Sequence, residues 1–165
     1  VGSHPIAGSE QSGFEHATAD LFRQRVCVVC RHADQAAAAD RVAGFWRQIG
    51  MQIRFMSAAE HDRVLARTSH LPHVLASVAA GCVSDSELEF TGTGFRDTTR
   101  IAAGSAEIWS SILLQNREAC LNAIDAASGV LAAYREAIER ADGERLSDLW
   151  NSAAARRRRL DDPGT

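Results

Sequence analysis

Residues 57–80, SAAEHDRVLARTSHLPHVLASVAA, decide how the rest of the chain is interpreted. Ser57, with Glu60 three residues later, has the capping-box spacing that satisfies free N–H groups at a helix start. Apolar residues then recur at spacings of three, four and seven, which predicts one buried helix face. That face consists of Val64, Leu71, Leu75, Val78 and Cys82. The stretch is therefore predicted to be one long helix that packs into a core.

Two histidines, His70 and His73, flank Pro72 inside this helix. Proline has no N–H for the carbonyl four residues back and crowds that carbonyl, at a cost of about 3 kcal/mol, so a kink is expected. The histidines are three residues apart and project from neighbouring positions. On their own they fit hydrogen-bonded interior residues or a functional site, so the rest of the chain has to decide.

The segments before residue 57 predict a βαβ unit. Residues 26–30 and 51–56 have the composition of strands, and residues 34–49 have helical spacing, with Gly50 just after the end. Strand, helix and strand in about thirty residues imply a parallel pair. We interpret residues 1–56 as the tail of a Rossmann-like α/β domain.

The β signal disappears after Ser57. Residues 84–100 are predicted to be a polar connection, and the helices after it cover residues 105–114, residues 116 to about 143, and a last segment with Leu146, Leu149 and Trp150. The fold class is therefore mainly α: a remnant of an α/β domain, then an all-α domain over residues 57–165.

Composition excludes several classes of function. The formal charge of −3 offers no basic surface for nucleic acid, and the arginine run 156–159 is expected to be a solvated tail. No apolar run approaches the roughly 20 residues of a membrane span and no signal segment opens the chain, so we expect a cytoplasmic protein without membrane contact. Cys27 and Cys30 lie on opposite faces of a predicted strand. With Cys82 and Cys120 we expect four buried thiols and no metal site.

The chain starts with VGSHPIAG, without a methionine, and is predicted to be a piece of something longer. Residues 1–13 are predicted to form a glycine-rich loop after a strand end. His4 precedes Pro5, which favours an extended backbone and fixes its direction. A histidine held this way is a candidate catalytic residue, or else it stabilises a turn.

Three segments together resemble the prephenate/arogenate dehydrogenases of tyrosine biosynthesis. They are HPIAGSEQSG (residues 4–13), SHLPH (69–73) and GTGFRDTTRIA (92–102), and Trp109 follows them. The likeness runs from His4 to about Ala141. It implies an N-terminal dinucleotide-binding domain and a C-terminal helical domain that builds a homodimer. No GxGxxG occurs here, so the residues that hold the pyrophosphate and choose NAD or NADP would lie outside the chain, which alone would be inactive.

The resemblance also implies a reaction and roles for particular residues. Hydride leaves the ring carbon that bears the hydroxyl of prephenate or arogenate, CO2 departs, and the ring becomes aromatic. His4 matches the catalytic histidine and is expected, with Gly8, to touch the cofactor. Arg100 and His73 match substrate contacts, and His70 and Asp97 are expected near the substrate. Trp109 is expected to reach the neighbouring subunit's site. A charged gate is expected from Glu10, Asp62 and Arg96.

Other interpretations stay open at this point. Gly104 stands where some family members have a serine, which puts substrate preference in doubt. A β-hydroxyacid dehydrogenase would use a lysine on the helix after the sheet, and this chain has no lysine. A non-catalytic helical dimer module that binds an aromatic acid as a regulator is also possible. Arg96, Asp97 and Arg100 could be a surface ion-pair cluster only.

Overall fold

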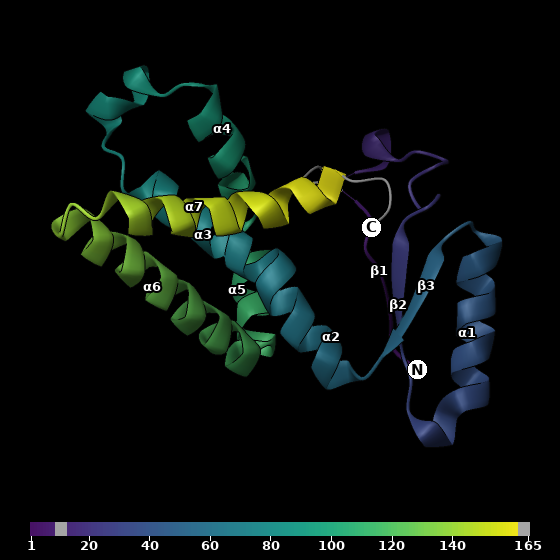
Figure 1. The fold of residues 1–165 in the computed structure, drawn as a ribbon. Helices are drawn as coiled ribbons and strands as arrows, with labels where there is room; N and C mark the ends of the chain where they lie inside the picture. Colours follow the sequence, from purple (N-terminus) through teal and green to yellow (C-terminus); the bar gives the residue numbers. More distant parts are fainter. Residues whose placement is uncertain (9–12, 162–165) are drawn as a thin grey trace. The chain divides into compact units, whose positions relative to one another are not determined.

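The structure is a computed structural model that describes residues 1–8 and 13–161. The chain divides into two compact units, Val1–Cys120 and Leu121–Thr165. Figure 1 shows the order of the elements along the chain. The first unit carries a small sheet and the helices up to the start of α6, and the second carries the rest of α6 and α7.

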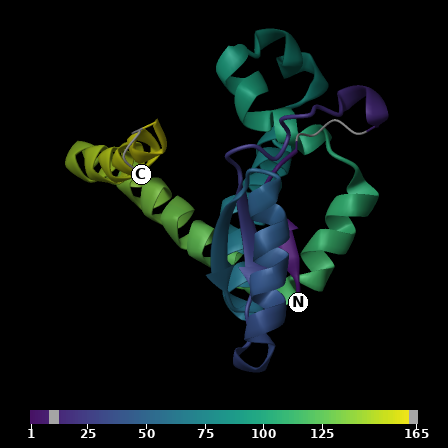
Figure 2. The same ribbon diagram turned by 90° about the vertical axis from the view of Figure 1, so that its right-hand side faces the viewer.

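The sheet has the order β1-β2-β3. β2 (Val26–Cys30) and β3 (Gln52–Met56) are parallel, and α1 (Ala36–Gln48) connects them across one face of the sheet, which confirms the βαβ prediction (Figure 2). β1 (Ser3–Pro5) pairs antiparallel with β2. The predicted loop over the first residues is therefore wrong at β1, which is too short to show a strand pattern.

The core of this part lies between the sheet and α1. Valine and cysteine side chains of β2 pack against small side chains of α1, and the fully or nearly buried members are Cys27, Val29, Ala39, Ala43 and Met51. Trp46 covers the cluster and donates from Nε1 to Ser3 Oγ at 3.1 Å. Gly50 ends the helical segment with φ of 93°, a left-handed conformation that favours glycine. This packing fixes β1 and its histidine in place.

The long helix is present but contains a π turn. α2 (Ala58–Leu65) begins at Ser57, whose hydroxyl accepts from the Glu60 N–H at 3.1 Å, as predicted. The π turn Ala66–His70 follows, and α3 (Leu71–Gly81) continues the helix. The Leu71 N–H donates to Ala66 O, five residues back. The irregularity expected at Pro72 is thus a wide turn just before the proline.

The predicted buried face of this helix is wrong in its second half. Leu75 and Val78 are 48% and 56% exposed, and Cys82 is exposed, whereas Leu65, Ala66 and Ala76 are buried. Spacing counted as α-helix through a π turn loses its phase, because the π turn takes more residues per turn. Of the four cysteines, Cys27 and Cys120 are buried, so the prediction of four buried thiols is wrong for Cys82.

Residues 84–100 are also more ordered than predicted. A 3-10 helix covers Asp85–Phe90, α4 covers Thr93–Thr99, and a second 3-10 turn covers Arg100–Ala103. Ser84 and Glu87 form a capping box at the first of these, a signal that was present in the sequence. α5 (Ala106–Gln115) follows, with Ser105 as its N-cap.

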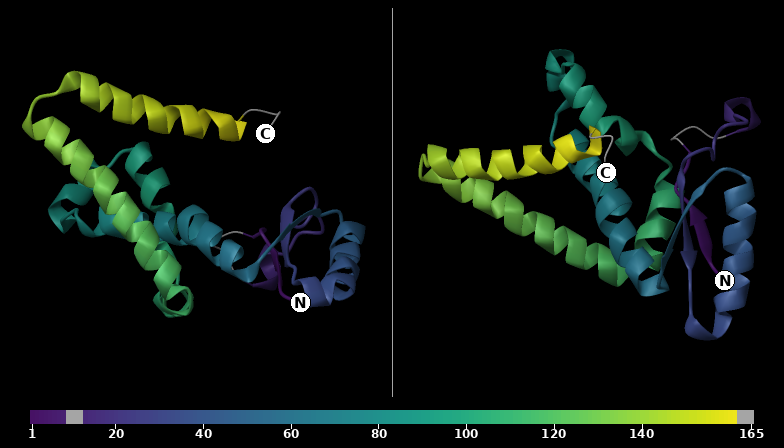
Figure 3. Two further views of the ribbon diagram at one scale, coloured as in Figure 1. Left: turned by 60° about the horizontal axis from the view of Figure 1, so that its bottom comes forward. Right: turned by 45° about the vertical axis from the view of Figure 1, so that its right-hand side comes forward.

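The second unit is a helical hairpin. α6 (Arg117–Glu139) starts in the first unit and continues into the second, where a short connection joins it to α7 (Gly143–Arg158), which runs back in the opposite direction (Figure 3). Asp142 caps α7 by accepting from the Arg145 N–H at 2.9 Å. Among the described residues, no helix combines the length and the apolar composition that crossing a bilayer requires. A small sheet followed by helices is the predicted fold class.

Candidate active site

A row of three side chains joins the sheet to the long helix. His4 is the middle residue of β1, where it pairs with Val28. Its Nδ1 lies 2.9 Å from Nε2 of His61 on α2, and Nδ1 of His61 lies 2.9 Å from Oδ1 of Asp62. The three groups therefore form one hydrogen-bonded row, His4–His61–Asp62, that starts in a strand and ends on a helix.

The hydrogen bonds determine where the protons of this row lie when both rings are neutral. An ionised carboxylate only accepts, so His61 carries its proton on Nδ1 and its Nε2 becomes an acceptor. His4 must then donate through Nδ1, which leaves the lone pair of its own Nε2 free. An imidazole in this state can accept the proton of a substrate hydroxyl.

The surroundings of His4 favour its neutral form. Burial lowers the pKa of His4 below its ordinary value of 6.5, and positive charge on His61 lowers it further. His4 as a whole residue is exposed, and its ring lies against the His61 ring with 5.1 Å between the centroids. A histidine with a lowered pKa is unprotonated at neutral pH, as a general base must be.

The π turn brings His70 toward the same side as this row. Nine residues make about two and a half turns of α-helix, which would leave His61 and His70 on opposite sides. The backbone rotates less per residue in a π turn, which brings the His70 side chain closer to the side of the helix that carries His61. The side chain of Asn116 then connects His70 with the Asp62 backbone. Its Nδ2 donates to the carbonyl oxygen of Asp62 at 2.8 Å and lies 3.3 Å from Nδ1 of His70.

These contacts also determine which ring nitrogen of His70 carries the proton. Asn116 must present its NH2 group to the Asp62 carbonyl, so Nδ1 of His70 is an acceptor and its Nε2 carries the proton. The thiol of Cys120 lies 3.4 Å from the same Nδ1, and burial raises the pKa of that thiol, so it stays protonated. Burial first, and then the charges of His61 and His73, lower the pKa of His70. His70 is thus a neutral hydrogen-bond donor.

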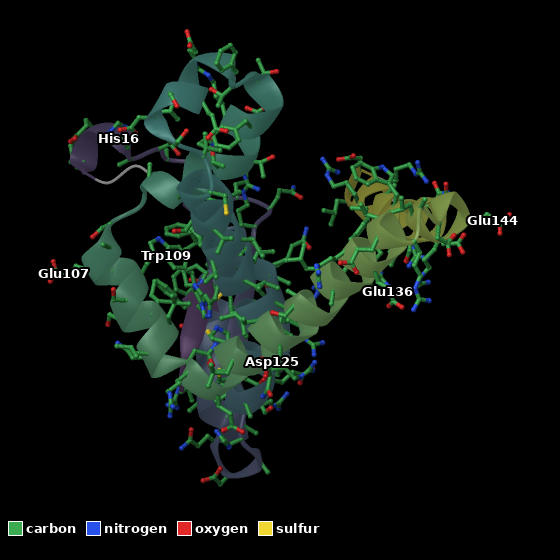
Figure 4. All side chains as sticks on the ribbon, turned by 90° about the vertical axis from the view of Figure 1, so that its left-hand side faces the viewer. His16, Glu107, Trp109, Asp125, Glu136 and Glu144 are labelled. Atoms are coloured by element: carbon green, nitrogen blue, oxygen red, sulfur yellow. The ribbon has the colours of Figure 1, made fainter. Side chains whose placement is uncertain are left out.

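His73 and Trp109 form a stacked pair. Their ring centroids lie 3.6 Å apart with 26° between the planes. The His70 ring packs edge-on against the Trp109 ring, with 6.3 Å between the centroids. Figure 4 shows Trp109 on α5, with its side chain turned toward the helix that carries the histidines. Nδ1 of His73 donates to Ser69 O at 2.9 Å, which leaves Nε2 for a ligand.

Gly104 provides the space that the Trp109 indole occupies. A Cβ at this position would stand 2.7 Å from Nε1 and 2.9 Å from Cδ1 of Trp109. Both distances are shorter than van der Waals contact allows, so any other residue displaces the ring. The glycine that replaces a serine in some family members is therefore tied to the position of Trp109 in this chain.

The remaining predicted site residues lie on and around α4. Arg96 and Asp97 are exposed on α4, and the backbone N–H of Arg96 donates to Gly92 O at 3.3 Å. Arg100 is exposed at the first position of the 3-10 turn that follows α4. Asp62 is bound to His61, and Glu10 lies outside the described residues. The charged gate of Glu10, Asp62 and Arg96 stays a prediction.

The turn after β1 fits the close approach of a flat ring. Gly8 has φ of 119°, and no atom lies within 4 Å of a Cβ built on it, so the backbone there is open next to the strand that carries His4. The sequence has no GxGxxG loop for a pyrophosphate. Within residues 1–8 and 13–161, no group of three or more metal-ligating side chains comes together.

Sequence reasoning missed His61 and Asn116. In the triplet Glu60–His61–Asp62, the sequence predicted a cap role for Glu60 and a gate role for Asp62, but no role for His61. A histidine next to an aspartate was the available signal, but its link to His4 depends on how β1 meets α2, and its relation to His70 depends on the π turn. Neither can be read from periodicity.

Two family models match the chain. The model described as "Prephenate dehydrogenase, nucleotide-binding domain" matches residues 1–55, and the model described as "Prephenate dehydrogenase, dimerization domain" matches residues 57–151. Together they cover the sheet, the site and most of the helices.

Individual relatives agree with these models. A cyclohexadienyl dehydrogenase of Zymomonas mobilis is 37% identical over 161 residues, 93% of this chain and 55% of that protein. A prephenate dehydrogenase of Bacillus subtilis is 31% identical over 161 residues, 93% of this chain and 43% of that protein. The chain therefore spans about half the length of the curated relatives it matches.

A solved structure has the same fold. The crystal structure of prephenate dehydrogenase from A. aeolicus in complex with hydroxyphenyl propionate and NAD+ matches with a TM-score of 0.85 and 28% identity. The match covers 96% of this chain and 58% of that one. The likeness confirms the predicted combination of α/β remnant and helical domain.

The role of Gly104 can be tested with Gly104→Ala. The added methyl group should push the indole of Trp109 off His73 and change its fluorescence emission, measured with Trp46 and Trp150 replaced by phenylalanine. Gly94→Ala is the control, because no atom lies within 4 Å of a Cβ there. Unchanged emission in Gly104→Ala would show that the indole does not occupy this space.

Proposed function

The chain belongs to the prephenate dehydrogenase family, and we propose that it supplies the catalytic histidine and the substrate site of an NAD- or NADP-dependent dehydrogenase. Its substrate is prephenate or arogenate, which it decarboxylates oxidatively to 4-hydroxyphenylpyruvate or tyrosine. The observation that carries this proposal is the row His4–His61–Asp62, which leaves Nε2 of His4 unprotonated. Residues 1–56 form part of the cofactor domain, and residues 57–165 form the substrate and dimer domain.

His4 acts on the hydroxyl of the ring. NAD or NADP, when bound, supplies the hydride acceptor. As hydride leaves the carbon that bears the hydroxyl, Nε2 of His4 accepts the hydroxyl proton, which removes the positive charge that would otherwise build on the oxygen. Loss of CO2 then leaves its electron pair in the ring, which becomes aromatic, and His4 returns the proton to the phenol oxygen. No net proton is consumed.

The substrate carboxylates meet Arg100 and His73 in this proposal. A guanidinium binds a carboxylate through two parallel hydrogen bonds, and Nε2 of His73 faces away from its bond to Ser69. His70 adds a neutral donor, and the stack of His73 on Trp109 holds the direction of the imidazole. Asp97 lies three residues before Arg100 and contributes negative charge beside it.

We further propose that the enzyme is a homodimer through its helical domain. Two large apolar side chains of α6, Leu131 and Ile138, are 69% and 65% exposed among the described residues. Such side chains on one helix face are typical of a surface that another subunit covers. The match of residues 57–151 to a dimerization domain supports the same conclusion.

Replacing His4 by asparagine in the dehydrogenase that contains this chain tests the proposal. We expect kcat to fall by roughly 10²–10⁴-fold, the share that a general base contributes, with little change in KM for prephenate or arogenate. The measurement is steady-state reduction of NAD or NADP with each substrate. A kcat near that of the wild type would exclude His4 as the base. A regulatory binding module would bind the acid and reduce no cofactor.

The matched variant is Arg100→Ala. It removes a substrate contact and leaves the base, so KM should rise while kcat changes less. An unchanged KM would exclude Arg100 from the substrate site.

Leu131→Glu together with Ile138→Glu tests the dimer. Burying two carboxylates in an apolar interface is unfavourable, so light scattering should give the monomer mass for this variant and the dimer mass for the wild type. Ala126→Glu adds one carboxylate at an exposed position on the other side of α6 and should leave the dimer intact. A dimer mass for the double variant would place the interface elsewhere.

A further inference from the structure

We propose that His61, held by Asp62, is a positioning residue that keeps His4 in its proton-accepting form and shares the charge His4 gains during the reaction. This inference rests on the proposed function of His4. It concerns two residues of α2 for which the sequence offered no such role. The geometric basis is the unbroken row of hydrogen bonds from Asp62 Oδ1 to His4 Nδ1, with 2.9 Å at each step.

The row controls which nitrogen of His4 is free. Without an acceptor at Nδ1, a neutral imidazole can carry its proton on either nitrogen, and only one of the two forms exposes a lone pair at Nε2. His61 is that acceptor as long as Asp62 keeps the His61 proton on Nδ1. In a catalytic triad a carboxylate orients the catalytic imidazole directly. Here the His61 ring lies between the carboxylate of Asp62 and the imidazole of His4.

The burial of the two groups suits this role. The side chain of His61 is 19% exposed and is therefore mostly covered by protein, whereas the Asp62 side chain is 56% exposed and its carboxylate is in contact with solvent. When His4 takes the hydroxyl proton it becomes cationic, and its Nδ1–H bond to His61 becomes charge-assisted and stronger. Stabilisation therefore increases toward the transition state, which is the condition for an effect on kcat.

The titratable groups near His4 come from α2, the π turn and β2. His61 of α2 contacts it directly, with Asp62 on the far side of the His61 ring, and His70 of the π turn interacts with it electrostatically. Cys27 of β2 lies against the backbone of His4. Of the ionisable neighbours, His61 is the one whose charge acts on the pKa of His4, in the downward direction. Removing the charge of His61 while keeping an acceptor for His4 Nδ1 must therefore raise the pKa of His4 and move the acid limb of kcat to higher pH.

Two substitutions at His61 separate its roles. His61→Gln keeps an acceptor at the position of Nε2 but cannot become positive, and His61→Leu removes both properties. In the dehydrogenase that contains this chain, we expect His61→Leu to lower kcat by roughly 10-fold or more, with KM within about twofold. His61→Gln should retain more of kcat, and its acid limb should lie at higher pH than that of the wild type. Asp62→Ala should lower kcat in the same direction as His61→Leu.

The outcomes distinguish this inference from the proposed function. If the wild type reduces NAD or NADP with prephenate or arogenate and His4→Asn does not, while His61→Leu keeps the wild-type kcat and acid limb, the role of His61 is wrong and that of His4 stands. If the wild type shows no turnover, the proposed function fails first. A merely structural His61 would lower the melting temperature in both variants and leave the acid limb where it is.

Discussion

The missing N–H of Pro72 is the constraint on which the site depends. A helix that passes through a proline must leave one carbonyl without its usual donor, and this chain meets the problem with the π turn Ala66–His70 just before it. The side chain of His73 bonds Ser69 O, one of the carbonyls in this region. The rotation lost in the π turn decides which helix side chains share a face, and it brings His70 into the reach of Asn116, which also binds the turn of Asp62.

Because of the π turn, several histidines lie close together. Positive charge on one of them disfavours positive charge on the others. His4 and His70 both have pKa values below the ordinary one, with burial as the first cause and neighbouring histidines as the second. The lowered pKa values favour neutral His4 and His70 at neutral pH, and each of these rings is hydrogen-bonded to a neighbouring side chain. In the proposed function, His4 is the base and the guanidinium of Arg100 binds a substrate carboxylate. These two residues lie in different segments of the first unit.

The sequence predicted those parts that depend on local rules. The strands predicted at residues 26–30 and 51–56, the helix between them and the Ser57 cap follow from composition, spacing and cap chemistry, and the structure has each of these elements, with the second strand at Gln52–Met56. β1 was missed because three residues carry no periodic signal, and the Ser84–Glu87 capping box was overlooked within a polar segment. The wrong burial of Leu75 and Val78 came from counting helical spacing through the π turn. His61 was missed because its partner is fifty-seven residues away in the chain.

The state of His4 is the central point of this account, and its imidazole can be observed directly. The measurement is an NMR titration of the ring ¹⁵N and ¹³C signals of this chain, with His4 assigned by comparison with His4→Asn. The account predicts a neutral ring with the proton on Nδ1 and a pKa below 6.5. A ring with its proton on Nε2 at neutral pH, or a pKa above 6.5, would contradict it.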